Sequence, residues 1–221
     1  MSSGDNQMSD EIKEKYWSRF SATFDKNQEY VVGKDFLNEV KIAINKLNDL
    51  GEVLELGCGT GCFTEAIAKN SNQVFATDLS EELLENAKKR LNSLKHITFQ
   101  KENCYSTSFE SEKFDTVFMA NLIHVVEDPS KVLQECFRVL KDDGLLIITS
   151  FTNYGMKPFE IIKLGFRFIK VWGKPPVHTH RFSPDSLGSL MESAGFSIEE
   201  SKLLGNRIKS LYLTGRKNII K

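Results

Sequence analysis

Three glycines at alternate positions form the stretch of this chain best suited to hold a ligand. Residues 53–61, with the sequence Val-Leu-Glu-Leu-Gly-Cys-Gly-Thr-Gly, begin like a buried strand and end like a tight loop. Glycine has no Cβ, so a ligand can lie against the bare backbone of such a loop, and the backbone amides suit a negatively charged group. The pattern predicts a nucleotide-like ligand held between a strand and the helix that follows it.

Two carboxylates beside this loop narrow the choice of ligand. Glu55 stands two residues before the first glycine, and Asp78 follows the next apolar stretch at 73–77. A nicotinamide dinucleotide favours Gly-x-Gly-x-x-Gly, whose third glycine is replaced here by Cys62. S-adenosylmethionine carries a sulfonium and an ammonium, which acids near the loop would stabilise. Asp78 suits the ribose of either ligand, so Glu55 and the glycine spacing favour S-adenosylmethionine, with a nicotinamide-dependent oxidoreductase as the alternative.

Further matches along the chain connect this pattern to a known family. Residues 55–61 resemble its motif I, residues 114–129 resemble motif IV and the loop after it, and residues 139–144 resemble its leucine-lysine, turn and glycine signature. The matches cover residues 52–151 in the correct order, and the chain resembles the class I S-adenosylmethionine-dependent methyltransferases, in the small-molecule group that includes quinone methyltransferases. The resemblance implies S-adenosyl-L-methionine as cofactor, S-adenosyl-L-homocysteine as product, and methyl transfer to a small, apolar or lipid-like acceptor by in-line displacement.

The resemblance also implies a set of cofactor contacts. Asn103 stands twelve residues before Asp115, where the family commonly has an aspartate for the adenine amino group, and an asparagine offers both an acceptor and a donor there. An aromatic N-terminal segment covers the cofactor in many relatives, and Tyr16 and Phe24 are the matching residues. The expected cofactor contacts are Glu55, Gly57, Cys58, Gly59, Gly61, Asp78, Leu79, Asn103, Cys104, Ala120, Asn121, Tyr16 and Phe24.

His124 is the candidate catalytic residue, because it follows the fourth expected strand at the edge where α/β sheets bind ligands. It would serve as a general base only for a weak or protonated nucleophile, and a structural role is the alternative. The Pro-Pro-aromatic motif of nucleic-acid amino methyltransferases and the Pro-Cys of cytosine C5 enzymes are both missing after this strand. These absences favour a small molecule over nucleic acid. The expected substrate contacts are His124, Phe166, His180 and Arg181.

The cysteines and histidines do not predict a metal site. The four cysteines lack the pattern of a disulfide scaffold, which favours a reduced, cytoplasmic protein. Cys58, Cys62 and Cys104 fall near the cofactor loops and would suit a soft ion, as in an arsenite methyltransferase, but Cys62 begins a helix expected to turn toward the sheet. His178 and His180 lack a third ligand, so no metal is expected.

Strands and helices alternate through the middle of the chain. Most strands are apolar on both faces, which predicts a parallel sheet between two layers of helices. A turn at Gly205 and Asn206 predicts a final hairpin, so the expected fold is α/β: a doubly wound, Rossmann-like, seven-stranded sheet, mostly parallel with an antiparallel last strand, plus a helical cap. The expected strands are 52–56, 73–77, 97–100, 114–120, 144–149, 196–198 and 210–214, and the expected helices are 11–24, 36–47, 62–69, 80–91, 129–140, 157–174 and one beginning after Ser183.

The expected organisation is a disordered tail at 1–10, N-terminal helices acting as a lid at 11–50, a cofactor-binding core at 51–152, a cap insertion at 153–182, and a helix and hairpin completing the sheet at 183–221. A formal net charge of −1 gives no general attraction to nucleic acid, and no apolar run is long enough to cross a membrane. A monomer or a homodimer is expected.

The expected helix at 157–174 bears most directly on the acceptor. Apolar residues recur at 3-4-3 steps and basic residues at 4-3-4 steps, which predicts an amphipathic helix with a basic stripe beside its apolar face. The simplest interpretation is a cap whose apolar face covers the active site. The alternatives are a clasp for a lipid-like acceptor, or peripheral membrane contact, which a non-catalytic cofactor-binding protein would also make. The residues are Phe159, Ile162, Phe166 and Ile169 on the apolar face, and Lys163, Arg167, Lys170 and Lys174 on the basic stripe.

Overall fold

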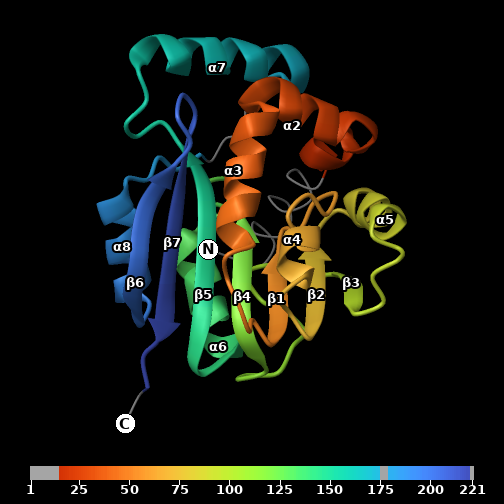
Figure 1. Cartoon of the computed structure of the whole chain (residues 1–221), viewed down its shortest axis with the longest axis vertical. Helices are drawn as coiled ribbons and strands as arrows, with labels where there is room; N and C mark the ends of the chain where they lie inside the picture. The colour runs from red at the N-terminus through yellow and green to blue at the C-terminus, as the bar shows by residue number, and fades with distance from the viewer. Residues whose placement is uncertain (1–14, 175–178, 220–221) are drawn as a thin grey trace, which may run out of the picture.

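The computed structural model describes residues 15–174 and 179–219, which form one seven-stranded sheet with helices on both faces (Figure 1). The strand order is β3-β2-β1-β4-β5-β7-β6; β7 runs antiparallel to both of its neighbours, β5 and β6, and the other pairs are parallel. The expected doubly wound sheet with an antiparallel last strand is confirmed. The strands are β1 Glu52–Leu56, β2 Gln73–Asp78, β3 Ile97–Lys101, β4 Phe114–Ala120, β5 Leu140–Thr152, β6 Phe196–Leu204 and β7 Lys209–Lys217.

The chain changes its direction of travel across the sheet between β1 and β4. It first builds outward from β1 to β3, and then returns to place β4 on the other side of β1. In open α/β sheets, ligands bind at such a switch point, outside the carboxyl ends of the strands. Gly57 follows β1, Asp78 ends β2 and Asn121 follows β4, so the expected ligand contacts meet at this edge.

Helices cover both faces of the sheet, and each face has its own apolar layer. On one face, α3 and α4 pack against side chains such as Val53 and Phe118, and on the other, α6 and α8 pack against Leu54 and Val117. Neighbouring residues of a strand point to opposite faces, so the continuous apolar runs in the sequence reflect burial on both sides. The helices are η1 Ser21–Thr23, α2 Phe24–Val32, α3 Lys34–Ile44, α4 Thr64–Ala68, α5 Glu81–Arg90, α6 Pro129–Val139, α7 Pro158–Trp172 and α8 Pro184–Ser193.

The starts of α5 and α8 follow their signals in the sequence, whereas several strands, β5 and β6 most of all, run longer than expected. The Ser80 hydroxyl accepts the Leu83 amide at 3.2 Å at the start of α5, and Ser183 forms a capping box at the start of α8. β5 begins at Leu140 rather than at 144, and β6 continues to Leu204. Both extensions are largely polar, and a polar sequence of this kind resembles a loop.

The N-terminal segment differs from the single helix expected at 11–24. Residues 15–18 are helical, a turn follows, and η1 leads into α2, whose continuation to Val32 the apolar pattern does not predict. α2 is largely polar, with Val31 as its buried residue, and it is held by packing against α7. The expected tail at 1–10, the beginning of the expected helix and His178 lie outside the described residues.

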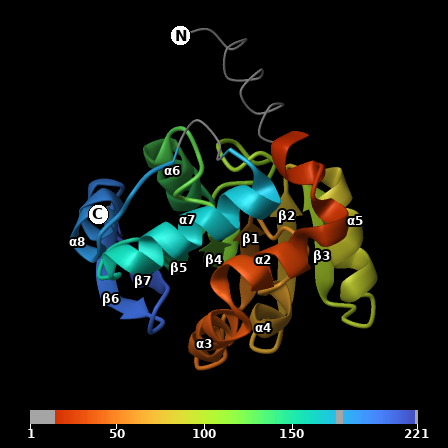
Figure 2. The same ribbon diagram turned by 90° about the horizontal axis from the view of Figure 1, so that it is seen from above.

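α2 and α7 lie next to each other above one end of the sheet, as Figure 1 and, from above, Figure 2 show. A third apolar cluster joins them, built on Val31 of α2 with Met156, Leu164 and Trp172. The two helices are far apart in the sequence, so this end of the molecule is closed by tertiary packing rather than by one continuous segment.

Candidate ligand-binding and active site

A cavity of about 270 Å³ lies at the switch point, between the carboxyl ends of the strands and the helices above them. Its volume is just below the range for small-molecule sites, roughly 300–1,000 Å³. The floor comes from the glycine loop and from the loops after β2, β3 and β4, and the roof comes from Trp17, α2 and α7. The expected site residues that line it are Phe24, Glu55, Gly57, Cys58, Gly59, Asp78, Leu79, Asn103, Cys104, Ala120, Asn121 and His124.

The glycines of the loop differ in their surroundings, although all have a left-handed backbone, with φ of 72° at Gly57, 56° at Gly59 and 77° at Gly61. A Cβ at Gly59 would lie 3.9 Å from its nearest neighbour in the described part of the chain, so this residue presents bare backbone to the cavity. A Cβ at Gly61 would lie 2.9 Å from Leu91, and Gly61 is not among the described residues of the cavity wall. Gly61 therefore allows close packing of the loop against the end of α5.

Asp78 clamps this loop from the end of β2. One carboxylate oxygen accepts the Gly59 amide at 2.8 Å, and the other accepts the Ser80 amide at 2.9 Å. The side chain thus fixes the glycine loop and the start of α5 together while it lines the cavity. An ionised carboxylate has about four acceptor sites, so bonds to the hydroxyls of a sugar are compatible with these two.

Glu55 is a buried acid on the cavity wall. It is 1% exposed, and its Oε2 atom has no hydrogen-bond partner among the described residues. Burial, with a smaller contribution from the nearby charge of Asp78, raises the pKa of Glu55 to about 8. A buried carboxyl of this kind stays protonated at neutral pH until a cation approaches. It is therefore suited to a positively charged group of a ligand.

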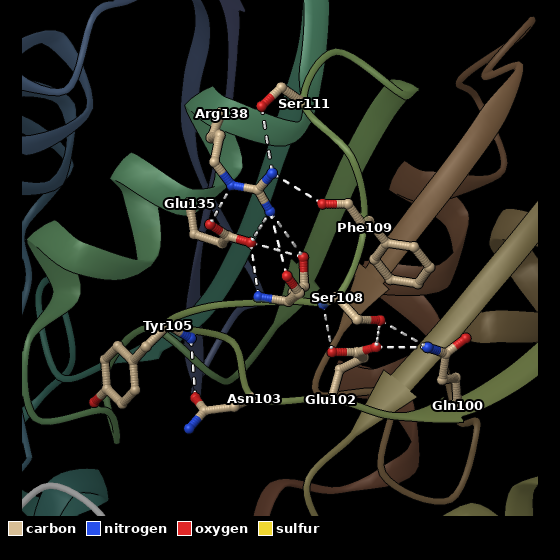
Figure 3. A network of polar contacts seen from close by, with 10 residues as sticks. Gln100, Glu102, Asn103, Tyr105, Ser108, Phe109, Ser111, Glu135 and Arg138 are labelled. Carbon is tan, nitrogen blue, oxygen red and sulfur yellow. Dashed lines mark hydrogen bonds and ion pairs between the residues drawn. The ribbon is translucent and has the colours of Figure 1, made fainter. Parts of the chain in front are cut away.

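The loop after β3 is held by a polar network, which Figure 3 shows. The Asn103 side-chain oxygen accepts the Tyr105 amide at 3.0 Å, which turns the backbone at the cavity wall. Further along, the Thr107 amide and hydroxyl both donate to the buried Glu135 of α6 at 2.7 Å, and Glu135 pairs with Arg138 at 2.6 Å. The loop that carries Asn103 is thus anchored to α6 by the protein itself.

The roof is tied to the floor by Asp25 of α2. Its carboxylate accepts the Thr60 hydroxyl of the glycine loop at 2.5 Å and pairs with Arg90 of α5 at 2.9 Å. In the roof, the rings of Trp17 and Trp172 meet edge to face with centroids 5.9 Å apart. The Trp172 indole nitrogen is buried without a hydrogen-bond partner in the described part of the chain. The N-terminal segment and α7 together close the cavity with an aromatic surface.

His124 lies on the cavity wall with its ring held in one orientation. Nδ1 is 3.0 Å from the Ser150 hydroxyl oxygen, and this hydroxyl donates to the Phe151 carbonyl oxygen at 3.4 Å. When Nδ1 donates its proton to the Ser150 oxygen, the ring lone pair lies on Nε2; in the other tautomer the Ser150 hydroxyl donates to Nδ1. Burial, and after it the nearby His180, lower the pKa of His124 to about 4. The imidazole is therefore neutral at physiological pH, and burial disfavours its protonated form.

Several expected contacts lie away from the cavity. The Tyr16 hydroxyl donates to the Trp172 carbonyl oxygen at 3.1 Å and so supports the roof, and Arg181 is exposed. The His180 backbone amide donates to the His124 carbonyl oxygen at 2.8 Å, and its Nε2 lies 3.0 Å from a backbone carbonyl oxygen of the same loop. His180 thus holds the loop that carries His124, and the described wall of the cavity includes none of these three residues.

α7 covers the cavity with a different side from the one its sequence suggests, which corrects the simplest interpretation of this helix. The face predicted to cover the site is exposed, with Phe166 at 73%. The helix is apolar on two sides, and the spacing of Phe168 and Trp172 is the signal of the second one. The α7 residues that line the cavity are Leu164, Phe168 and Trp172. The exposed residues, which we call the outer row, are Phe159, Ile162, Phe166 and Ile169.

Two of the thiols near the cavity, those of Cys58 and Cys62, are protonated rather than poised to bind a soft ion. All four cysteines are free, and burial raises the pKa of Cys58 and of Cys62. Among residues 15–174 and 179–219, no group of three His, Cys, Asp or Glu side chains is arranged to hold a metal ion.

Comparison with known proteins connects this site to a group of enzymes. The family described as "Methyltransferase domain" matches residues 54–148. The ubiquinone biosynthesis O-methyltransferase of Haemophilus ducreyi is 30% identical over 161 residues, covering 68% of this chain and 67% of that protein. The solved structure of a SAM-dependent methyltransferase from Thermotoga maritima has a TM-score of 0.72 at 24% identity, over 92% of this chain and 99% of its own. Another, from Aquifex aeolicus, has a TM-score of 0.65 at 21% identity, and the match covers 86% of this chain and 97% of that one.

Proposed function

Because the chain belongs to the class I S-adenosylmethionine-dependent methyltransferases, we propose that it methylates a hydroxyl oxygen of a small apolar molecule, with His124 as the general base. S-adenosylmethionine is its cofactor, and membership of this family excludes the nicotinamide-dependent alternative. The observation that carries the proposal is the neutral His124 imidazole, oriented by Ser150, on the wall of a cavity with an aromatic roof.

The cavity residues fit S-adenosylmethionine. The open space beside the Gly59 backbone suits the methionine part of the cofactor, the unsatisfied Glu55 suits a positive charge, and Asp78, which also accepts the Gly59 amide, suits the ribose hydroxyls. Asn103 and Cys104 are proposed for the adenine. When bound, the cofactor supplies an electrophilic methyl group: the C–S bond breaks as the new O–C bond forms, its electron pair stays on sulfur, and S-adenosylhomocysteine remains.

His124 takes the proton of the acceptor. A hydroxyl is a weak nucleophile, and transfer of its proton to Nε2 of His124 frees an oxygen lone pair for attack. The Ser150 oxygen continues to accept the Nδ1 proton, so it stabilises the imidazolium that forms. The aromatic side chains of the roof would limit the access of water, a competing nucleophile, to the reacting atoms.

The choice of acceptor rests on the lining of the cavity and on the relatives. Phe151, Leu164 and Phe168 give the wall an apolar surface, and the Trp172 indole N–H offers one donor for a polar atom of the acceptor. The curated relatives are named for O-methylation in ubiquinone biosynthesis, which supports a hydroxyl on an aromatic ring that bears an apolar substituent. We place the reaction in the cytoplasm, whose reducing conditions suit four free cysteines, and in a monomer or a homodimer.

An assay with matched acceptors tests this function. The set contains a phenol with an apolar alkyl chain, the same phenol without the chain, and the aniline that carries the chain. We expect S-adenosylhomocysteine and an O-methyl product with both phenols, a lower KM for the phenol with the chain, and little turnover of the aniline. N-methylation of the aniline with no reaction of either phenol would contradict the proposal.

Binding of S-adenosylmethionine should release a proton from Glu55. With a pKa of about 8, the carboxyl is mostly protonated at pH 7, and a bound cation lowers that pKa, so the proton leaves. Affinity should therefore rise with pH, by up to about tenfold per unit below pH 8. Calorimetric titrations at about pH 7, in two buffers of different ionisation enthalpy, should report close to one proton released per cofactor bound.

Two variants distinguish proton release by Glu55 from proton release or uptake by the ligand itself. Glu55→Gln should bind more weakly and release correspondingly fewer protons. Glu102→Gln is the matched control, because Glu102 also lines the cavity but accepts hydrogen bonds from Ser108 and Gln100. Equal proton release by the wild type and Glu55→Gln would show that Glu55 does not meet the charge of the ligand. S-adenosylhomocysteine keeps the ammonium but lacks the sulfonium. Proton release on its binding would therefore identify the ammonium as the partner of Glu55, and the absence of proton release would identify the sulfonium.

A further inference from the structure

The outer row of α7 forms an apolar ridge on the surface of the protein. Phe159 is 70% exposed, Phe166 73%, and Ile162 and Ile169 are each 59% exposed. Their spacing places them along one side of a helix that lies across the end of the molecule (Figure 1). Single exposed apolar residues are common on protein surfaces, but a continuous row of large ones indicates a site of interaction.

Basic side chains accompany this ridge. Residues 157–174 contain five basic residues and one acid, Glu160. None of the five forms an ion pair with another described residue. Arg167 and Lys170 lie 5.8 and 5.5 Å from the ring centroid of Tyr30 in α2, which is itself 45% exposed. The basic residues, which we call the basic flank, are Lys157, Lys163, Arg167, Lys170 and Lys174.

We propose that the outer row and the basic flank of α7 bind the surface of an anionic lipid bilayer. A helix with large apolar side chains beside unpaired lysines and arginines lies in the interface of a membrane, with its apolar side among the acyl chains and its cations near the headgroups. In the described residues, no helix is long and apolar enough to cross a membrane, so the contact is peripheral. The negative lipid headgroups complement the basic flank.

The same charges disfavour the other simple occupant of this face, a second copy of the chain. Two copies meeting through their outer rows would bring two basic flanks together, and the like charges would repel each other. An anionic bilayer covers the apolar row and neutralises the flank at the same time.

Docking of this helix would place the active-site cavity beside the bilayer. Leu164, Phe168 and Trp172 line the cavity from the opposite side of the same helix. An apolar molecule dissolved in the membrane would then reach the site over a short distance. The docking itself does not depend on which acceptor the enzyme uses.

Sedimentation of the full chain with lipid vesicles tests this inference. One set of vesicles is phosphatidylcholine, and the other contains about one third phosphatidylglycerol. We expect binding to the anionic vesicles and much weaker binding to the neutral ones. Raising the salt from about 0.15 M to about 1 M shortens the Debye length from roughly 8 to 3 Å and should reduce the binding.

Two sets of substitutions locate the contact. The first variant, Phe159→Ser with Phe166→Ser, removes half of the outer row. The second, Lys163→Gln with Lys170→Gln, removes two cations, each of which should contribute roughly a fivefold factor to partitioning onto anionic vesicles. We expect at least a tenfold loss of partitioning in each set, with cofactor binding unchanged. The control for the apolar row is Ile42→Ser, which changes an exposed residue of α3. The control for the cations is Lys46→Gln with Lys69→Gln, which changes two exposed lysines that follow α3 and α4.

The outcomes separate lipid binding from the alternatives. Failure of the wild type to sediment with the anionic vesicles would overturn the inference, as would equal losses in the α7 variants and the controls. Self-association without lipid that disappears in Phe159→Ser with Phe166→Ser would make this face an interface between copies instead. If the double serine variant does not fold, the glutamine variant alone decides, because it leaves the apolar row intact.

Discussion

Substitution of His124 by Gln should lower kcat by about 100- to 10,000-fold, the range typical for the loss of a general base. Glutamine can still donate and accept hydrogen bonds at this position, but it cannot take up the acceptor proton. Binding of S-adenosylhomocysteine should be unchanged, because His124 is proposed to act on the acceptor. The measurement is steady-state methyl transfer to the phenol that carries an alkyl chain, with calorimetry for the ligand.

Substitution of Ser150 by Ala provides a graded comparison. In the proposed mechanism the Ser150 hydroxyl accepts the Nδ1 proton, which would keep the lone pair on Nε2. Its loss should reduce kcat less than the loss of His124, because part of the imidazole population retains the productive tautomer. If His124→Gln turned over as fast as the wild type, His124 would be a structural residue and the acceptor would need no base.

The pH dependence of the wild type gives an independent check. Since the pKa of His124 is lowered from 6.5 to about 4, kcat/KM should stay near its maximum down to about pH 5 and fall below it. The unfolded chain binds more protons than the folded one between these two values, so the free energy of unfolding also falls as the pH decreases through this window. Melting temperatures measured at each pH show whether activity falls because His124 becomes protonated or because the protein unfolds.

Substitution of Asp78 by Ala should weaken cofactor binding by roughly two orders of magnitude or more. Two charge-assisted bonds to ribose hydroxyls would contribute about 3 kcal/mol or more together, and the glycine loop would also lose its clamp at the Gly59 amide. Titration with S-adenosylhomocysteine measures the effect directly, without turnover.

Asp115→Ala is the matched control for Asp78→Ala. Asp115 also accepts a backbone amide, that of Glu52, at 2.8 Å, and it pairs with Lys141 at 2.7 Å. It stands near the start of β4, at the edge of the sheet opposite the cavity. Its loss should lower the melting temperature without a comparable change in affinity. Unchanged affinity in Asp78→Ala would mean that the ribose lies elsewhere.

The floor of the cavity is close to what the sequence predicts, because its residues sit at the ends of strands that local patterns identify. Glu55 and Asp78 follow from apolar runs that are buried on both faces of the sheet, and the expected fold is confirmed on the same basis. Their roles toward the cofactor stay predictions. Gly61 shows that the glycine spacing alone does not identify every residue of the cavity wall, because Gly61 faces Leu91 rather than the cavity.

The roof is less predictable, because contacts between distant segments determine it. α2 is polar enough to resemble a loop, and it is held by packing against α7 and by the contacts of Asp25 with Thr60 and Arg90. α7 is apolar on two sides, and periodicity cannot choose between them. The contact of Trp17 with Trp172 selects the inner side, and it joins residues that no local window of sequence includes.

The place of β7 in the sheet has a consequence for how the protein is made. β5 is 13 residues long and pairs with β4 on one side and with β7 on the other. β7 is translated only after α7, α8 and β6, so a nascent chain carries β5 as an open, apolar edge, which invites association with other chains. Gly205 has a φ of 86° in the turn before β7, and we therefore expect chaperone demand and soluble yield to depend on this residue. A side chain at Gly205 should reduce the amount of protein recovered from cells more than the activity of the molecules that complete the sheet.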